Sequence, residues 1–121
     1  MAIAGNLGFP RIGGRRELKW AVEHYWKGEL GEEELQEVAR QLRRHHWELQ
    51  RDAGIGHIPV GDFSLYDHVL DTAAMVGAAP KRFGGRRSSI DLPTYFAMAR
   101  GTQEVVPLDM TKWFDSNSGT R

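Results

Sequence analysis

The sequence predicts an α/β protein with parallel strands. Segments of strand character alternate with segments of helical spacing, in the order strand, two helices, strand, two helices, strand. Long helical crossovers between successive strands imply that the strands pair in parallel. Because a parallel sheet normally has both faces covered and more than three members, the chain has the pattern of the beginning of a larger fold. The expected strands lie at residues 5–14, 55–63 and 110–115, and the expected helices at residues 18–26, 32–53, 64–76 and 92–99.

The first two helices are predicted by the spacing of their apolar residues. In the first helix these residues recur at intervals of three and four, and Gly28 is a plausible stop. They are Leu18, Ala21, Val22, Tyr25 and Trp26. The second helix begins near Glu32 with three acidic residues and carries arginines in its later turns, an order that complements the helix dipole. Gly54 ends it.

Residues 55–63 predict a short buried strand. Ile58 and Val60 supply its apolar positions, and Pro59 removes one hydrogen-bond donor from its ladder. Asp62 lies at the carboxyl end of this strand.

The second half of the chain repeats the pattern. Residues 64–67, Ser-Leu-Tyr-Asp, fit a helix-start box, and helical spacing continues to Gly77. A shorter helix at residues 92–99 is stopped by Gly101, and residues 110–115, Met-Thr-Lys-Trp-Phe-Asp, form the third expected strand.

Composition excludes several classes of protein. The 121 residues include sixteen basic and sixteen acidic side chains, with 40% hydrophobic and 26% charged residues, as in an ordinary globular domain or part of one. No apolar run approaches the roughly 20 residues that a membrane span needs. The absence of cysteine removes disulfides and cysteine-ligated zinc sites. The charge balance argues against nucleic-acid binding by a bulk field, and we expect a cytoplasmic location.

A basic cluster marks the start of the first expected helix. Four cations surround the Gly13–Gly14 pair, namely Arg11, Arg15, Arg16 and Lys19. Unpaired N–H groups, the positive end of the helix dipole and these cations together suit an anion site. The alternative is a solvated helix start that is basic without binding anything.

Two further positions are candidates. Asp62 and Asp67 follow the second expected strand, where α/β proteins build their sites. The alternative interpretation, which we favour from the sequence, is that Asp62 or Ser64 caps the following helix. Lys112 stands beside Trp113 in the third expected strand, and the alternative there is a solvated edge lysine.

The histidines do not predict a metal site. They have no His-Glu-x-x-His spacing and no cysteine partner, so we interpret each as a surface or half-buried side chain. They are His24, His45, His46, His57 and His68. The Gly84–Arg87 loop is basic but has no aromatic platform, so solvated surface is the default there.

Several blocks of residues resemble one known family. The blocks are Asn-Leu-Gly-Phe-Pro-Arg-Ile-Gly at 6–13, Arg-Glu-Leu-Lys at 16–19, Tyr-Trp-Lys-Gly at 25–28, Gly-Asp-Phe-Ser-Leu-Tyr-Asp-His-Val-Leu at 61–70, Tyr-Phe-Ala-Met-Ala-Arg-Gly at 95–101 and Met-Thr-Lys-Trp-Phe-Asp at 110–115. In this order they resemble the cobalamin-independent methionine synthases over nearly the whole chain.

The resemblance implies the fold more closely. The family enzyme has two (β/α)8 barrels, and this chain is expected to be the N-terminal portion of the first. That portion is incomplete, with about three strands and paired crossover helices, since a full barrel needs about 250 residues. Residues 1–117 are expected to start the folate-binding barrel. Residues 118–121 depart from the family, which continues with Tyr-His-Tyr after Asn117, and are expected to form a disordered tail.

The resemblance also implies a function. The family enzyme moves a methyl group from 5-methyltetrahydrofolate polyglutamate to homocysteine to make methionine. Its folate-tail contacts map onto Arg16, Glu17, Leu18 and Lys19, and onto Lys112. Its zinc and homocysteine site lies in the second barrel. Zinc is therefore implied for the full-length enzyme only, and this segment is expected to hold no metal, no cofactor and no catalytic residue.

Other readings remain open from sequence. The chain is alternatively a small anion- or nucleic-acid-binding module, or a remnant with no ligand. The leading interpretation expects neither a membrane nor a nucleic acid as a partner. It does expect self-association through a strand edge near residues 3–8 or 111–115, because uncovered edges are templates for pairing.

Overall fold

The computed structural model describes residues 1–109 and places its helices in two compact units. The first unit is Met1–His68, and the second begins at Val69. The helices are α1 (Glu17–Trp26), α2 (Glu32–Asp52), α3 (His68–Met75), the 3-10 turn η1 (Lys81–Phe83) and α4 (Leu92–Arg100).

The α/β expectation is wrong for the described residues, which form helices and no sheet. The start of a (β/α)8 barrel with three strands is therefore not what the structure has. Within the described residues, the β-pairing between the first two expected strands is limited to an isolated parallel bridge between Gly5 and His57. The third, residues 110–115, lies outside the described part of the chain, as does the expected tail at 118–121.

The bridge does not extend, for reasons visible in its hydrogen bonds. The Ala4 carbonyl accepts both the Gly56 and His57 N–H groups, at 2.9 and 3.0 Å, and the Asn6 N–H donates to the His57 carbonyl at 3.3 Å, so the pairing stays within a few residues. On one side Asn6 turns its side chain back to accept the Gly8 N–H at 3.3 Å. On the other side Pro59 has no N–H to donate. Local bonds of this kind compete with a strand ladder.

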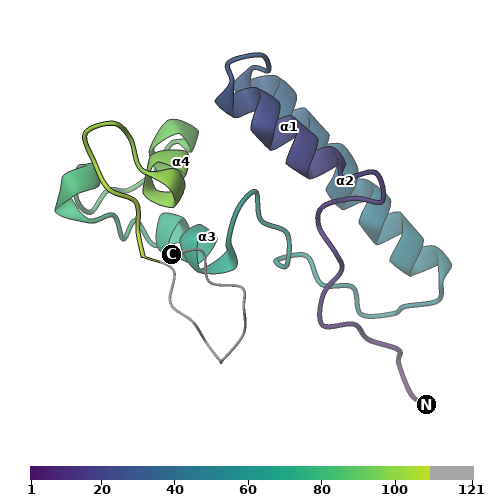
Figure 1. Ribbon diagram of the computed structural model, residues 1–121. Coiled ribbons are helices and arrows are strands. Elements are labelled where there is room, and N and C mark those ends of the chain that lie inside the picture. The colour runs from purple at the N-terminus through teal and green to yellow at the C-terminus, as the bar shows by residue number, and fades with distance from the viewer. Residues whose placement is uncertain (110–121) are drawn as a thin grey trace. The chain divides into compact units, whose positions relative to one another are not determined.

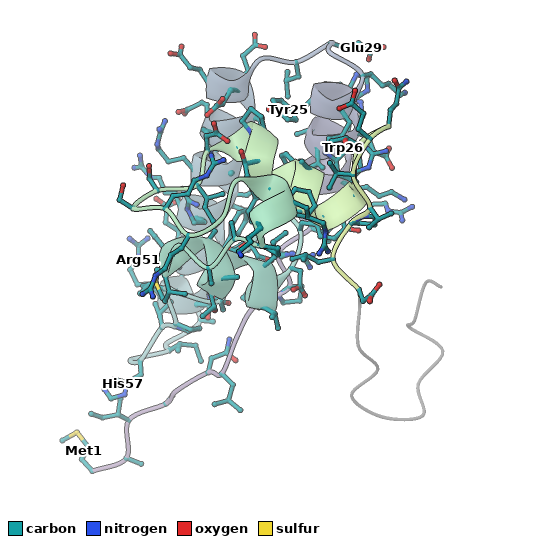
Figure 2. All side chains as sticks on the ribbon, turned by 90° about the vertical axis from the view of Figure 1, so that its left-hand side faces the viewer. Met1, Tyr25, Trp26, Glu29, Arg51 and His57 are labelled. Atoms are coloured by element: carbon teal, nitrogen blue, oxygen red, sulfur yellow. The ribbon has the colours of Figure 1, made fainter. Side chains whose placement is uncertain are left out.

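The first unit is built around a helical hairpin. Helices α1 and α2 pack side by side and run in opposite directions (Figure 1). Tyr25, Trp26 and Glu29 lie together at the closed end of the hairpin, and Arg51 lies toward the far end of α2 (Figure 2). The chain reverses after Gly28, whose φ of 75° is a conformation that glycine adopts at little cost.

The apolar spacing of the sequence explains the hairpin core. The buried side chains recur at three- and four-residue intervals on both helices, as an amphipathic pair requires. They are Leu18, Ala21 and Val22 from α1, and Leu35, Ala39 and Leu42 from α2. Beyond Leu42 the buried face of α2 continues through His46 and Gln50, whereas Leu49 is 46% exposed.

The second unit has a small core of its own. Six side chains fill it: Leu70, Phe83, Leu92, Tyr95, Phe96 and Met98. Helices α3 and α4 are joined by a hydrogen bond of 2.5 Å from the Tyr95 hydroxyl to Asp71 Oδ1. Asp91 caps α4 by accepting the Thr94 N–H at 2.9 Å, and hydrogen bonds from the Thr94 side chain and then from this N–H lower the pKa of the Asp91 carboxyl. None of the helices within residues 1–109 has both the length and the apolar character that a membrane span requires.

Candidate functional site: the start of helix α1

The approach to helix α1 is an irregular segment, residues 6–13, held at several points along its length. At its first residue, Asn6 Nδ2 donates to Gln50 Oε1 at 2.9 Å. Gln50 is only 4% exposed and donates its own Nε2 to the His46 carbonyl at 3.0 Å. The buried amide therefore fixes the beginning of the segment to α2.

Asp62 holds the middle of the segment. Its Oδ2 accepts the Phe9 N–H at 2.7 Å, a charge-assisted hydrogen bond. The backbone passes close by at Gly8, where a Cβ atom would lie 3.6 Å from the same oxygen. The Phe9 ring packs on the ring of His46, with centroids 4.7 Å apart.

Arg11 holds the end of the segment, where it joins the helix start. Its Nε donates to the Ser64 carbonyl at 2.9 Å and its Nη2 to the Tyr66 carbonyl at 2.6 Å. Arg11 was a member of the predicted anion site, but the structure commits its guanidinium to backbone carbonyls. The same bonds explain why α3 begins at His68 and not at Ser64: these carbonyls accept from Arg11, outside any helix.

The capping interpretation of Asp62 and Ser64 is wrong. Neither lies at the first residue of α3 or next to it. Asp62 binds a backbone N–H 53 residues earlier in the chain. The Ser64 side chain is 1% exposed, and its hydroxyl has no hydrogen-bond partner in the described structure.

The first turn of α1 is set by three backbone hydrogen bonds. The Arg16 N–H donates to the Gly13 carbonyl at 3.1 Å, the Leu18 N–H to the Ile12 carbonyl at 3.0 Å, and the Trp20 N–H to the Arg16 carbonyl at 3.0 Å. Arg16 sits at the N-cap with φ 60° and ψ 31°. Among the described residues it is the non-glycine residue with positive φ, a conformation that costs an L-residue about 1–2 kcal/mol.

Glu17 folds back over this turn. Its Oε2 accepts the Arg15 N–H at 3.0 Å. Hydrogen bonds from the backbone N–H of Glu17 itself and then of Arg15 hold the pKa of this carboxyl below its ordinary value. An internal carboxylate therefore already occupies part of the helix start that the sequence offered to an external anion.

The structure separates the predicted tail-contact residues into two groups. Arg16 and Lys19 are exposed, and Lys19 Nζ lies 3.8 Å from Glu23 Oε1 in a solvent-exposed pair. Leu18 is 0% exposed, so its side chain belongs to the hairpin core. Lys112 lies outside the described residues.

Sequence reasoning missed the buried polar residues of α2. His46 is 6% exposed, and burial, followed by the nearby His45, lowers its pKa, against smaller opposing effects of Asp62 and Glu17. The available signal was the spacing: His46 and Gln50 continue the interval of four from Leu42.

The described residues do not fit a metal centre. Within residues 1–109 no three histidine, aspartate or glutamate side chains gather in a way that could hold an ion. The chain has no cysteine to add to them. No step of chemistry is assigned to a metal here.

Comparison with known proteins identifies the family. The family model described as the N-terminal domain of cobalamin-independent synthase matches residues 3–118. The chain belongs to this family. Proteins named 5-methyltetrahydropteroyltriglutamate–homocysteine methyltransferase are its relatives. That of Acidiphilium cryptum is 59% identical over 97% of this chain, that of Streptomyces coelicolor 57% over 96%, and that of Salinibacter ruber 54% over 97%. The chain spans only 15–16% of the length of these relatives.

In this cobalamin-independent synthase N-terminal domain, two of the sequence blocks are physically joined. The block at residues 6–13 donates hydrogen bonds to the block at residues 61–70, where the Asp62 carboxylate and the Ser64 and Tyr66 carbonyls accept them. The resemblance of the two blocks was visible in sequence, whereas their contact is a result of the structure.

Proposed function

We propose that this chain is the N-terminal part of a methyltransferase that makes methionine by moving a methyl group from 5-methyltetrahydropteroyltriglutamate to homocysteine, and that its own contribution is to bind the triglutamate tail. The names of the relatives support the reaction and its two substrates. The chain spans about one sixth of their length. We propose that methyl transfer, homocysteine and zinc belong to the rest of the full-length protein.

The observation that supports tail binding is the exposed basic start of α1 at the end of an anchored segment. Arg16 and Lys19 reach solvent from the first turn of the helix, with Arg15 exposed beside them. A triglutamate tail is a chain of carboxylates, and guanidinium and ammonium groups bind carboxylates through charge-assisted hydrogen bonds. Family membership adds Lys112, which we include in the site although it lies outside the described residues.

The other two members of the proposed site have supporting roles. The Leu18 side chain is buried, so it fixes the helix on the hairpin core and does not itself meet the tail. The Glu17 carboxylate binds N–H groups of the first turn and so holds the turn in shape before a ligand arrives. The proposed folate-tail site is thus Arg16, Glu17, Leu18, Lys19 and Lys112.

Binding to folates of different tail length tests the proposal. The chain is titrated with triglutamyl and monoglutamyl 5-methyltetrahydrofolate, and separately with an oligonucleotide of equal charge, at two salt concentrations. We expect tighter binding of the triglutamyl form and a loss of affinity with salt. Equal affinity for both folates, or stronger binding of the oligonucleotide, contradicts tail recognition and favours diffuse positive charge.

A further inference from the structure

We infer that Asp62 is a positioning residue for the tail site, acting through the Phe9 backbone and not through contact with the ligand. The inference rests on the proposed function. Asp62 is half-buried, carries the same sign of charge as the tail, and spends its Oδ2 on the Phe9 N–H at 2.7 Å. A residue of that charge does not bind a polyanion directly.

The path from Asp62 to the helix start is short and continuous. Phe9 is fixed by Asp62, and Arg11 is fixed two residues later by the Ser64 and Tyr66 carbonyls. The next residue, Ile12, accepts the Leu18 N–H, and Gly13 accepts the Arg16 N–H. The positions of the anchored residues therefore determine the position of the turn that carries Arg16.

The close approach at Gly13 makes this turn sensitive to a shift of the segment. Its φ is 91°, and a Cβ there would overlap the Glu17 carboxylate and lie 3.1 Å from Leu42 Cδ2, so this position has no room for a side chain. Release of the segment at Phe9 would let this turn shift. Such a shift would carry the Arg16 guanidinium with it.

An electrostatic effect and a positioning role of Asp62 predict opposite changes in triglutamyl folate affinity when the carboxylate is removed. Asp62→Ala removes a negative charge from the unit that binds a polyanion, so charge alone would strengthen binding of the triglutamyl folate. Loss of the anchor would weaken it, because a charge-assisted hydrogen bond at this distance is lost and the first turn is released. The direction of the change therefore decides between the two.

The experiment uses the whole chain and three variants. Asp62→Ala removes the acceptor and the charge, and Asp62→Asn removes the charge but keeps an acceptor oxygen. Asp52→Ala is the matched control, since Asp52 is an exposed aspartate of the same unit, paired only with its neighbour Arg51. For each variant we measure the affinities for triglutamyl and monoglutamyl folate by calorimetry, and the hydrogen exchange of the Phe9 and Leu18 amides by NMR.

The expected result is a loss of about tenfold in triglutamyl affinity for Asp62→Ala, with little change for the monoglutamyl form. Phe9 and Leu18 should exchange faster while the amides of α2 keep their protection. Asp62→Asn should recover most of the affinity, and Asp52→Ala should match the parent. Tighter binding by Asp62→Ala, or equal loss in the Ala and Asn variants, overturns the inference.

Two outcomes separate this inference from the proposed function. If the parent chain does not distinguish the two folates, the proposed function fails and the binding role of Asp62 fails with it, whatever the amides do. If the parent does distinguish them and Asp62→Ala changes neither the preference nor the Phe9 exchange, tail binding stands and the positioning role is overturned. A uniform increase in exchange across the first unit shows a stability role only, and also overturns it.

Discussion

Asn6 and Gln50 are joined side chain to side chain although 44 residues separate them, with Asn6 Nδ2 2.9 Å from Gln50 Oε1. Gln50 uses its other amide atom on the His46 carbonyl one turn earlier in α2. A side-chain amide buried to this degree is stabilising only while both its ends are satisfied. The pair thus ties the N-terminal segment to helix α2.

Gln50→Ala should lower the free energy of unfolding of the first unit by about 1–3 kcal/mol, because it removes a buried side chain together with its hydrogen bonds to Asn6 and to the His46 carbonyl. Denaturant unfolding followed by circular dichroism measures the loss. Gln41→Ala is the control: Gln41 is on the same helix, bonded to Glu37 at 3.0 Å, but exposed, and should change stability by less than about 0.5 kcal/mol. Similar losses in the two variants would show that burial of Gln50 does not matter.

Arg16→Gly should raise the stability of the chain while it weakens the binding of triglutamyl folate. Glycine adopts the φ of 60° without the steric cost that arginine bears there, so the variant should gain up to about 1 kcal/mol in unfolding free energy. It should also lose triglutamyl folate affinity by about tenfold, since the guanidinium is gone. Arg15→Gly removes the same charge without relieving a positive φ and should not be stabilised. A fall in stability for Arg16→Gly would mean that the left-handed residue carries no strain.

Lys112→Ala tests the member of the site that the structure does not describe. If Lys112 meets the tail, its loss should weaken triglutamyl binding by about tenfold or more. Arg86→Ala removes an exposed charge from the loop before α4 and should have little effect, because exposed charges are screened within about 10 Å. Equal losses of triglutamyl affinity from the two substitutions would show that Lys112 acts only through a general attraction of anions.

The buried His46 predicts a pH dependence of stability. Its folded-state pKa lies below the ordinary value of 6.5, so the unfolded chain binds a proton first as pH falls. The contribution of neutral His46 is therefore complete above about pH 6.5 and is lost as pH falls toward the lowered pKa. Unfolding free energies measured from about pH 7.5 to about pH 5.5 should fall with acidification in the parent and less steeply in His46→Leu. His45, the exposed neighbour of His46, provides the control variant His45→Leu. An identical pH dependence of the unfolding free energy in His45→Leu and His46→Leu would contradict the prediction.

The helices could be predicted from sequence because their determinants are local. Helix α2 begins and ends within a residue of expectation, and α4 was confirmed at Leu92–Arg100, because apolar spacing and flanking residues act over a few positions. The predicted start of α3 at Ser64 was wrong because the Ser64 carbonyl accepts a hydrogen bond from the Arg11 guanidinium. Arg11 lies 53 residues earlier in the chain. The strand predictions were wrong for the same kind of reason. A strand forms only where a partner segment pairs with it, and that depends on which groups the partner segment hydrogen-bonds.

The candidate site was predicted in part. The basic residues Arg16 and Lys19 stand at an exposed helix start as expected, whereas Arg11 is committed to carbonyls. The role of Asp62 could not be read from the sequence, since no spacing rule relates a carboxylate to a backbone N–H so far away. Self-association through an exposed edge near residues 3–8 stays a prediction, and the exposure of Ile3 and Leu7 in that segment is compatible with it.

The anchors at Asp62, Ser64 and Tyr66 also fix an order of assembly for the nascent chain. The α1–α2 hairpin depends on contacts that are complete once Asp52 has been made, and local contacts of this kind form fastest. The segment from Asn6 to Gly13 is synthesised before residues 62–66, which supply its hydrogen-bond acceptors, and closing that long loop carries an entropic cost. This segment therefore reaches its final geometry only after a later part of the chain has emerged, so the basic turn at Arg16 is completed after the helix that carries it.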